Sequence, residues 1–195
     1  MKTLATLTLA AFVLFAGTAQ AQEAGDAGIF GDAAGTQTTL DVVPSVPYNV
    51  YAVAFDLDGG LLAYEVGLDG VPVGTFALST TLFGPAPLNV GDANTFNYIV
   101  GTGGCVDQAG ALPLVTWNFL STVAPADDTA LVLRGTNLSS FDGVPGYAKC
   151  DESIATFGVA TDGGEQYPDG ALILNATGAP VSGDEESFGS MKARF

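Results

Sequence analysis

Short runs in which apolar and polar residues alternate follow one another along most of the chain, separated by glycine and proline. An alternation with a period of two is typical of β-strands that bury one face. Residues 61–68 show it clearly, because Glu65 falls on the face opposite to the apolar side chains of Leu62, Tyr64, Val66 and Leu68. We therefore expect a half-buried strand here, with Glu65 on its polar side.

The same pattern predicts about nine to eleven short strands. Residues 48–55 are rich in β-branched and aromatic side chains, so we expect a central strand there. Glycines at 101, 103 and 104 are expected to end the strand at residues 95–100 just before Cys105. Further strands are expected at residues 61–68, 73–78, 113–120, 130–134, 154–159 and 171–174, with edge strands at 27–30 and 38–43. Strands at this spacing, without helical periodicity after the first segment, indicate an all-β sandwich or barrel.

The first 21 residues have the three-part pattern of a secretory signal peptide. Lys2 supplies the positive start, residues 4–15 form an apolar run, and Ala19 and Ala21 are small residues where a signal peptidase reads. A transmembrane anchor is disfavoured because the run is shorter than the ~20 residues that a bilayer needs, and no apolar segment of that length follows. We predict cleavage after Ala21, a secreted domain at residues 22–182 and a tail at 183–195 that is first acidic and then basic.

Cys105 and Cys150 are the two cysteines of the chain, so they allow one pairing. In an oxidising compartment we expect them to form a structural disulfide. Two free thiols and a metal site are the alternatives. A metal site is disfavoured because two cysteines without histidine fall short of the usual four ligands.

Several stretches of the mature chain resemble cohesin-like or carbohydrate-binding-module-like β-sandwiches. Residues 50–55 and 60–68 are similar to the first strand pair of cohesins, and residues 114–119 are similar to a later strand. The start at residues 26–30 and the end at 187–195 resemble secreted bacterial proteins of this type. The resemblance implies a jelly-roll-type β-sandwich of antiparallel strands with a non-catalytic, extracellular role. Residues 68–70 are Leu-Asp-Gly where cohesins carry Tyr-Asp-Pro, so neither dockerin recognition nor any binding residue is carried over.

Composition excludes several classes of function. The chain contains no histidine, which removes Ser-His-Asp and Cys-His catalysis and histidine-bound metals. Five cations against 21 acidic residues give a net charge of −16, which disfavours nucleic-acid partners because phosphate contacts need Lys and Arg. With 48% hydrophobic residues the chain can still build a core.

Acidic residues in glycine-rich turns are candidates for calcium binding, and no other cofactor is indicated. Calcium binds six to eight oxygen ligands, and the turns at residues 55–60 and 162–170 are rich in oxygen. The candidate ligands are Asp56, Asp58, Asp162 and Asp169. Plain turns are the favoured alternative, because the EF-hand spacing is not met. Acid-base catalysis by the pairs Asp56 and Asp58, Asp127 and Asp128, or Asp151 and Glu152 is disfavoured, since nothing else assembles around them.

Exposed aromatic rings would be needed to bind carbohydrate. Trp117 alternates with apolar residues and is expected in the core, whereas Tyr147 and Tyr167 fall in predicted loops. Asn137 and Asn175 begin glycosylation triplets, whose use depends on the host.

We therefore expect a secreted, non-enzymatic module for adhesion or scaffolding that recognises an extracellular protein or a glycan. The alternative hypothesis is a filament or surface-layer subunit that assembles by strand addition, donating residues 26–43 or the tail from Phe188. A hydrolase is disfavoured, because the chain has no histidine and no nucleophile motif.

Overall fold

The computed structural model describes residues 23–137, 139–160 and 169–177. The predicted signal peptide with Ala19 and Ala21, the loop with Asp162 and Tyr167, and the predicted tail lie outside the described residues. Within those residues no helix is both long and apolar enough to cross a membrane.

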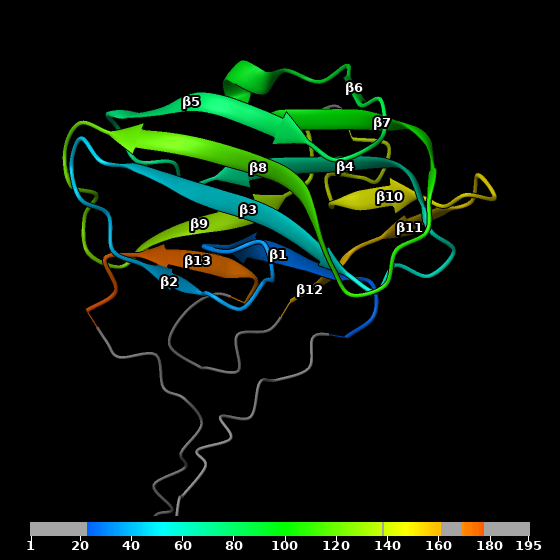
Figure 1. The fold of residues 1–195 in the computed structure, drawn as a ribbon, viewed down its shortest axis with the longest axis horizontal. Helices are drawn as coiled ribbons and strands as arrows, with labels where there is room; N and C mark the ends of the chain where they lie inside the picture. The colour runs from blue at the N-terminus through cyan, green and yellow to red at the C-terminus, as the bar shows by residue number, and fades with distance from the viewer. Residues whose placement is uncertain (1–22, 138, 161–168, 178–195) are drawn as a thin grey trace, which may run out of the picture.

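The described chain is an all-β sandwich of two sheets, as the sequence predicts (Figure 1). The first sheet has the order β12-β1-β3-β8-β5. Its strands are β12 (Gly158–Val159), β1 (Asp26–Phe30), β3 (Pro47–Phe55), β8 (Ala111–Ser121) and β5 (Thr75–Leu82). β3 lies in the middle, paired with both β1 and β8, and Val50 and residues 52–55 of this β-branched and aromatic strand are buried.

The second sheet runs in the order β11-β10-β4-β9-β13-β2, and β7 and β6 continue it from the other edge of β4. Its strands are β11 (Ile154–Thr156), β10 (Gly146–Ala148), β4 (Leu61–Asp69), β9 (Thr129–Arg134), β13 (Ala171–Leu174), β2 (Thr39–Leu40), β7 (Asn97–Val106) and β6 (Leu88–Asn89). A 3-10 turn, η1 (Ala93–Thr95), leads into β7. β4 is thus the branch point of this sheet, because β10 and β9 share one of its edges.

The core lies between the two sheets, and aromatic residues fill its centre. Trp117 of β8 is fully buried and donates a hydrogen bond of 2.9 Å from its Nε1 to the hydroxyl of Tyr98 on β7. The Tyr64 hydroxyl of β4 crosses the core and donates to the carbonyl of Leu114 on β8 at 2.7 Å. Burial raises the pKa of the Tyr64 hydroxyl. These bonds fix the two sheets relative to each other and satisfy polar groups that would be costly to bury alone.

The disulfide between Cys105 and Cys150 is present, with a Cα–Cα distance of 5.3 Å. Cys105 belongs to the end of β7, and Cys150 follows β10. The bond ties the β10–β11 hairpin to β7 on the far side of β4, and it lies against Gly60, where an added Cβ would come within 2.7 Å of the Cys150 sulfur.

Several expected elements differ from the structure. β7 continues through Gly101, Gly103 and Gly104 to Val106, because Gly101 pairs with β4 and β6 and Val106 pairs with β4 again after a register shift. The expected strand at residues 154–159 is divided between the two sheets as β11 and β12. β1 is an internal strand, since the short β12 covers its outer edge, whereas β2 lies at an edge as expected. Two strand pairs, β1–β12 and β13–β2, are parallel.

The prediction of an exposed Tyr147 is wrong, and that of Glu65 on the outer face is confirmed, although Glu65 is more buried than a polar face suggests. Tyr147 lies in β10 and is buried, stacked on Phe157 with 4.9 Å between ring centroids. Glu65 does face away from the core, but only 7% of its surface is exposed. Tyr147 is buried because β10 joins the second sheet and sets Tyr147 beside Tyr64 in the core. Glu65 is buried because the chain between β9 and β10 folds over the outer face of that sheet.

The double variant Cys105→Ser, Cys150→Ser is expected to fold and to lose about 3–4 kcal/mol of unfolding free energy in urea, because the closed loop spans 45 residues. Reductant should bring the wild type to the same midpoint and leave the variant unchanged. Equal stability of the variant and the oxidised wild type would show that the bond does not stabilise the fold.

Candidate functional site

The calcium candidates do not converge on one point in the described structure. Oδ1 of Asp56 accepts a hydrogen bond from the Gly110 amide at 2.6 Å, and Asp58 forms an ion pair with Lys149 at 2.9 Å. The hydrogen bond that Lys149 donates to Asp58 in this ion pair raises the pKa of the Lys149 ammonium. Asp169 is exposed. Among the described residues no three acidic or cysteine side chains are placed to hold a metal together, and calcium binding stays a prediction.

In the pairs of adjacent acidic residues, Asp128 and Asp151 accept hydrogen bonds that stabilise turns. Asp128 receives hydrogen bonds from the amide and hydroxyl of Thr177 at 2.9 and 2.6 Å. Asp151 accepts two hydrogen bonds from Ser153, one from its hydroxyl and one from its amide. The hydroxyl bond, and after it the amide bond, lowers the pKa of the Asp151 carboxyl. These contacts are those of turn-forming residues, and they bring no second carboxylate across a cleft.

Most of the aromatic candidates for sugar binding and of the asparagines of the glycosylation triplets are buried or hydrogen-bonded within the fold. Trp117 and Tyr147 are buried, so neither presents a ring to a sugar. The Asn175 side chain accepts from the Val42 amide at 2.8 Å and donates to the Pro125 carbonyl at 3.0 Å, so a glycan there would break two bonds of the fold.

A groove lies on the outer face of the second sheet. It has a volume of about 360 Å³ and lies over β6, β7, β4, β10 and β11, the strands grouped on the right of Figure 1. We call it the outer groove. The lining residues are Ala63, Tyr64, Glu65, Leu88, Val90, Ile99, Val100, Gly101, Ser140, Phe141, Ala148 and Ile154.

Strand register explains why a groove forms at this place. One cross-strand row runs through five strands and has small residues in its middle: Leu88, Gly101, Ala63, Ala148 and Ile154. The small residues make a low floor, and the large end residues make two walls about 19 Å apart at the usual strand spacing. Leu88 is 68% exposed and Ile154 is 65% exposed. The row therefore presents apolar surface to solvent on both sides of a hollow.

The third wall is a segment between β9 and β10, residues 135–137 and 139–145, which we call the covering loop. Phe141 packs over Gly146 of β10, where an added Cβ would come within 2.6 Å of its ring. The Ser140 amide donates to Oε2 of Glu65 at 2.9 Å, and the Thr136 hydroxyl lies 3.4 Å from the same atom. The covering loop thus shields the Glu65 side chain on the outer side of the sheet.

Glu65 is the one acidic residue that lines the outer groove. Both of its hydrogen bonds within the described chain reach Oε2, and Oε1 has no hydrogen-bond partner there. Glu65 as a residue is only 7% exposed, and a carboxylate oxygen in such surroundings is costly where it is shielded from water without gaining a donor. A ligand group that donates to Oε1 would remove this cost.

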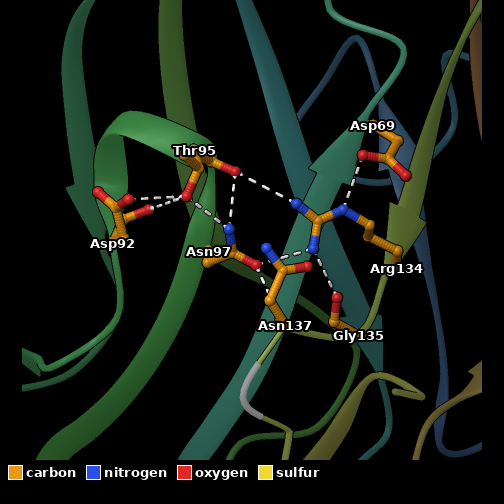
Figure 2. A network of polar contacts seen from close by, with 7 residues as sticks. All are labelled: Asp69, Asp92, Thr95, Asn97, Arg134, Gly135 and Asn137. Carbon is orange, nitrogen blue, oxygen red and sulfur yellow. Dashed lines mark hydrogen bonds and ion pairs between the residues drawn. The ribbon is translucent and has the colours of Figure 1, made fainter.

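Arg134 fixes the base of the covering loop through a polar network (Figure 2). Its Nε donates to Asp69 at 2.7 Å, and Nη1 donates to Oδ1 of Asn97 at 2.8 Å and to the Gly135 carbonyl at 2.7 Å. Nη2 reaches the Thr95 carbonyl at 3.2 Å. One guanidinium thus joins β4, β7 and β9 to the loop, with charge-assisted bonds that are stronger than neutral ones.

Two further residues make this network fit. Asn97 is 5% exposed, and its Oδ1 also accepts the amide of Asn137 at 3.1 Å, so one buried oxygen joins Arg134 to the loop. Gly67 lies under the guanidinium, where an added Cβ would come within 2.5 Å of Nη1. Both residues look unremarkable in sequence, and only their pairing across strands shows their role.

Another hollow, of about 620 Å³, lies beside the disulfide between β5, β8 and the end of β7. Its lining residues carry no charged group: Thr81, Leu82, Phe83, Gly84, Pro85, Cys105, Val106, Pro113 and Thr116. The outer groove combines apolar walls with a buried carboxylate and is the better candidate site.

Sequence reasoning did not identify this site. Alternation placed Glu65 on the polar face of its strand, which predicts exposure, and Leu88 and Ile154 carried no motif. The available signal was a cluster of small residues, Ala63, Gly101 and Ala148, at equivalent places in three strands. That signal requires the strand register, which the sequence does not supply.

No family model and no curated protein matches the chain. Similar solved structures include a cohesin module from a Clostridium perfringens family 33 glycoside hydrolase, 11% identical with a TM-score of 0.47, covering 78% of this chain and 98% of that one. The sixth cohesin of scaffoldin B from Acetivibrio cellulolyticus, solved with Cel5 dockerin, is 12% identical with a TM-score of 0.48, covering 79% and 99%. A non-cellulosomal cohesin from Archaeoglobus fulgidus is 13% identical with a TM-score of 0.46, covering 76% and 91%. These structures come from the family that the sequence resembles, and the likeness is one of fold alone.

Replacing Arg134→Met is expected to loosen the covering loop, because the Gly135 and Asn97 contacts are lost together. Amide exchange at Ser140 should become about tenfold faster, which corresponds to losing about 1.5 kcal/mol from a charge-assisted hydrogen bond. The matched variant Lys149→Met removes the other ion pair of the described chain, away from this loop, and should leave Ser140 exchange unchanged. Unchanged exchange in Arg134→Met would show that the network does not hold the loop.

Proposed function

We propose that this protein is a secreted, non-catalytic module for extracellular adhesion or scaffolding, and that it binds a protein or glycan partner through the outer groove. Secretion rests on the signal-peptide pattern of residues 1–21, with cleavage after Ala21. The disulfide is in keeping with an oxidising compartment.

The observation that carries the proposal is the five-strand row between Leu88 and Ile154. Large apolar side chains at two-thirds exposure, set on both sides of a small-residue floor, expose apolar surface that a partner would cover. The walls are built on strands and a pinned loop, so a partner would meet a preformed shape and lose little ordering entropy.

The groove chemistry supports binding without catalysis. Glu65 is its one carboxylate, whereas glycoside hydrolysis uses two across a cleft. Ser140 lines the groove, but the chain contains no histidine to activate its hydroxyl.

A second candidate function is self-assembly by strand addition, and the edge strand β5 favours it. β5 pairs with β8 on one side, and its side chains Phe76 and Leu78 are 57% and 54% exposed. Residues 26–30 are poor donors, because β1 is internal and four of its five residues are buried. The donors that remain for this alternative are the rest of the segment, residues 31–43 with the edge strand β2, and the tail from Phe188.

Filling the groove floor tests the binding function. Gly101→Val adds a side chain where an added Cβ meets nothing within 4 Å, so β7 should tolerate it while the hollow is filled. Immobilised mature protein is incubated with secreted and cell-surface proteins of the producing organism, and with a glycan array. We expect Gly101→Val to reduce retention of the wild-type partner by about tenfold or more, because the side chain excludes the buried contact.

The matched control is Gly104→Val, in the same strand but outside the groove, where the nearest neighbour of an added Cβ is Pro85 at 3.7 Å. It should retain the partner as the wild type does. Retention that is equal in all three proteins would exclude the groove as the binding site. Fibres in negative-stain images of all three would instead favour assembly through β5.

A further inference from the structure

Oε1 of Glu65 accepts no hydrogen bond from the described residues, and the groove around it restricts which donor group can reach it. The walls at Leu88, Phe141 and Ile154 are apolar, so the approaching group needs an aliphatic or aromatic body with a cationic end. A lysine side chain has this character, since its methylene stem can lie on apolar surface while the ammonium meets the carboxylate.

Cations are scarce in this chain. Of the five, Lys2 lies in the predicted signal peptide, and Arg134 and Lys149 form ion pairs with Asp69 and Asp58. The two that remain, Lys192 and Arg194, both lie in the last eight residues. A chain with a net charge of −16 therefore carries a short segment of opposite charge at its end.

The same eight residues are also apolar in a regular pattern. Phe188, Met191, Lys192 and Phe195 have the spacing i, i+3, i+4 and i+7, which places them on one face if the segment binds as a helix. Arg194 then falls outside this face. A face with two phenylalanines, one methionine and one lysine is complementary to an apolar groove that holds one buried carboxylate.

We propose that the outer groove binds the C-terminal segment of this same chain, residues 188–195, with the Lys192 ammonium on Oε1 of Glu65 and the aromatic residues against Leu88, Phe141 and Ile154. The inference goes beyond the proposed function, because it assigns the groove an occupant that every copy of the protein carries. Bound in its own chain, the segment competes with other partners. Bound in a second copy, it links copies head to tail.

Ten residues separate Thr177, the last described residue, from Phe188, and they can span up to about 35 Å. Residues 183–187 of this connection include three acidic side chains. The experiment therefore reports on both routes, within one chain and between chains.

The test uses the full mature chain, residues 22–195, with the photoreactive residue benzoylphenylalanine in place of Phe195. After irradiation, the attachment point is mapped by digestion at acidic residues and mass spectrometry. We expect attachment to Leu88, Phe141, Ile154 or their neighbours in the groove. An equal mixture of nitrogen-15-labelled and unlabelled chains gives products of mixed mass if the segment binds a second copy and of unmixed mass if it binds its own chain, and either result supports the proposal.

Two matched charge variants decide whether Lys192 and Glu65 form the contact. Lys192→Gln and Arg194→Gln remove the same charge from the same segment. The first should lower the yield of groove products by about tenfold or more, and the second should change it by less than about twofold, because long-range attraction alone is weak and screened. Glu65→Gln should match Lys192→Gln, since the amide keeps an acceptor for the Ser140 amide but loses the charge.

Gly101→Val provides a test that leaves all charges in place, and it should also abolish the groove products. Attachment outside the groove, or equal yields in all variants, would overturn the proposal. Loss of partner retention in Gly101→Val without any groove attachment of the segment would overturn the proposal alone and leave the proposed binding function standing. Attachment of the segment in the groove, together with partner retention that Gly101→Val leaves unchanged, would support the segment as the occupant and overturn the proposed binding function.

Discussion

The wall of the outer groove depends on one guanidinium. Arg134 lies where β4, β7 and β9 meet, and its donors are used by acceptors from each neighbouring segment and from the first residue of the covering loop. Because Gly67 leaves room beneath it, the side chain lies across β4. A single charged group with several well-placed acceptors holds a loop more firmly than separate neutral bonds, and here it fixes the wall of a groove.

Placing the covering loop over Glu65 costs folding free energy, because the loop buries a carboxylate. The covering loop buries most of Glu65, and the hydrogen bonds of the described residues satisfy only one of its two oxygens. A fold could avoid this cost with an apolar side chain, as replacement of buried ionic groups often shows. In the proposed function, a carboxylate between apolar walls would favour ligands with a cation, so the groove would gain discrimination at the expense of stability.

Local alternation predicted the strands of the sandwich well where one face meets the core. Tyr64, Val66 and Leu68 are buried as expected, and Trp117 is in the centre of the core. The pattern failed where strand partners decide, because β7 continues past Gly101, which pairs with Ala63 of β4 and Leu88 of β6, through an irregular stretch to Val106, which pairs with Leu61 of β4. It also missed the short strands β6 and β10, since two or three residues contain too little periodicity to detect.

The amino-acid sequence by itself determined the class of structure, the pairing of its two cysteines and the exclusion of histidine chemistry, because composition and short-range periodicity are properties of the chain alone. The tertiary structure decided the rest. Ala63, Gly101 and Ala148 form a floor only when three strands align, and Glu65 is buried only because a loop some 70 residues later folds over it. Such contacts depend on register and on long-range packing, which no local pattern encodes.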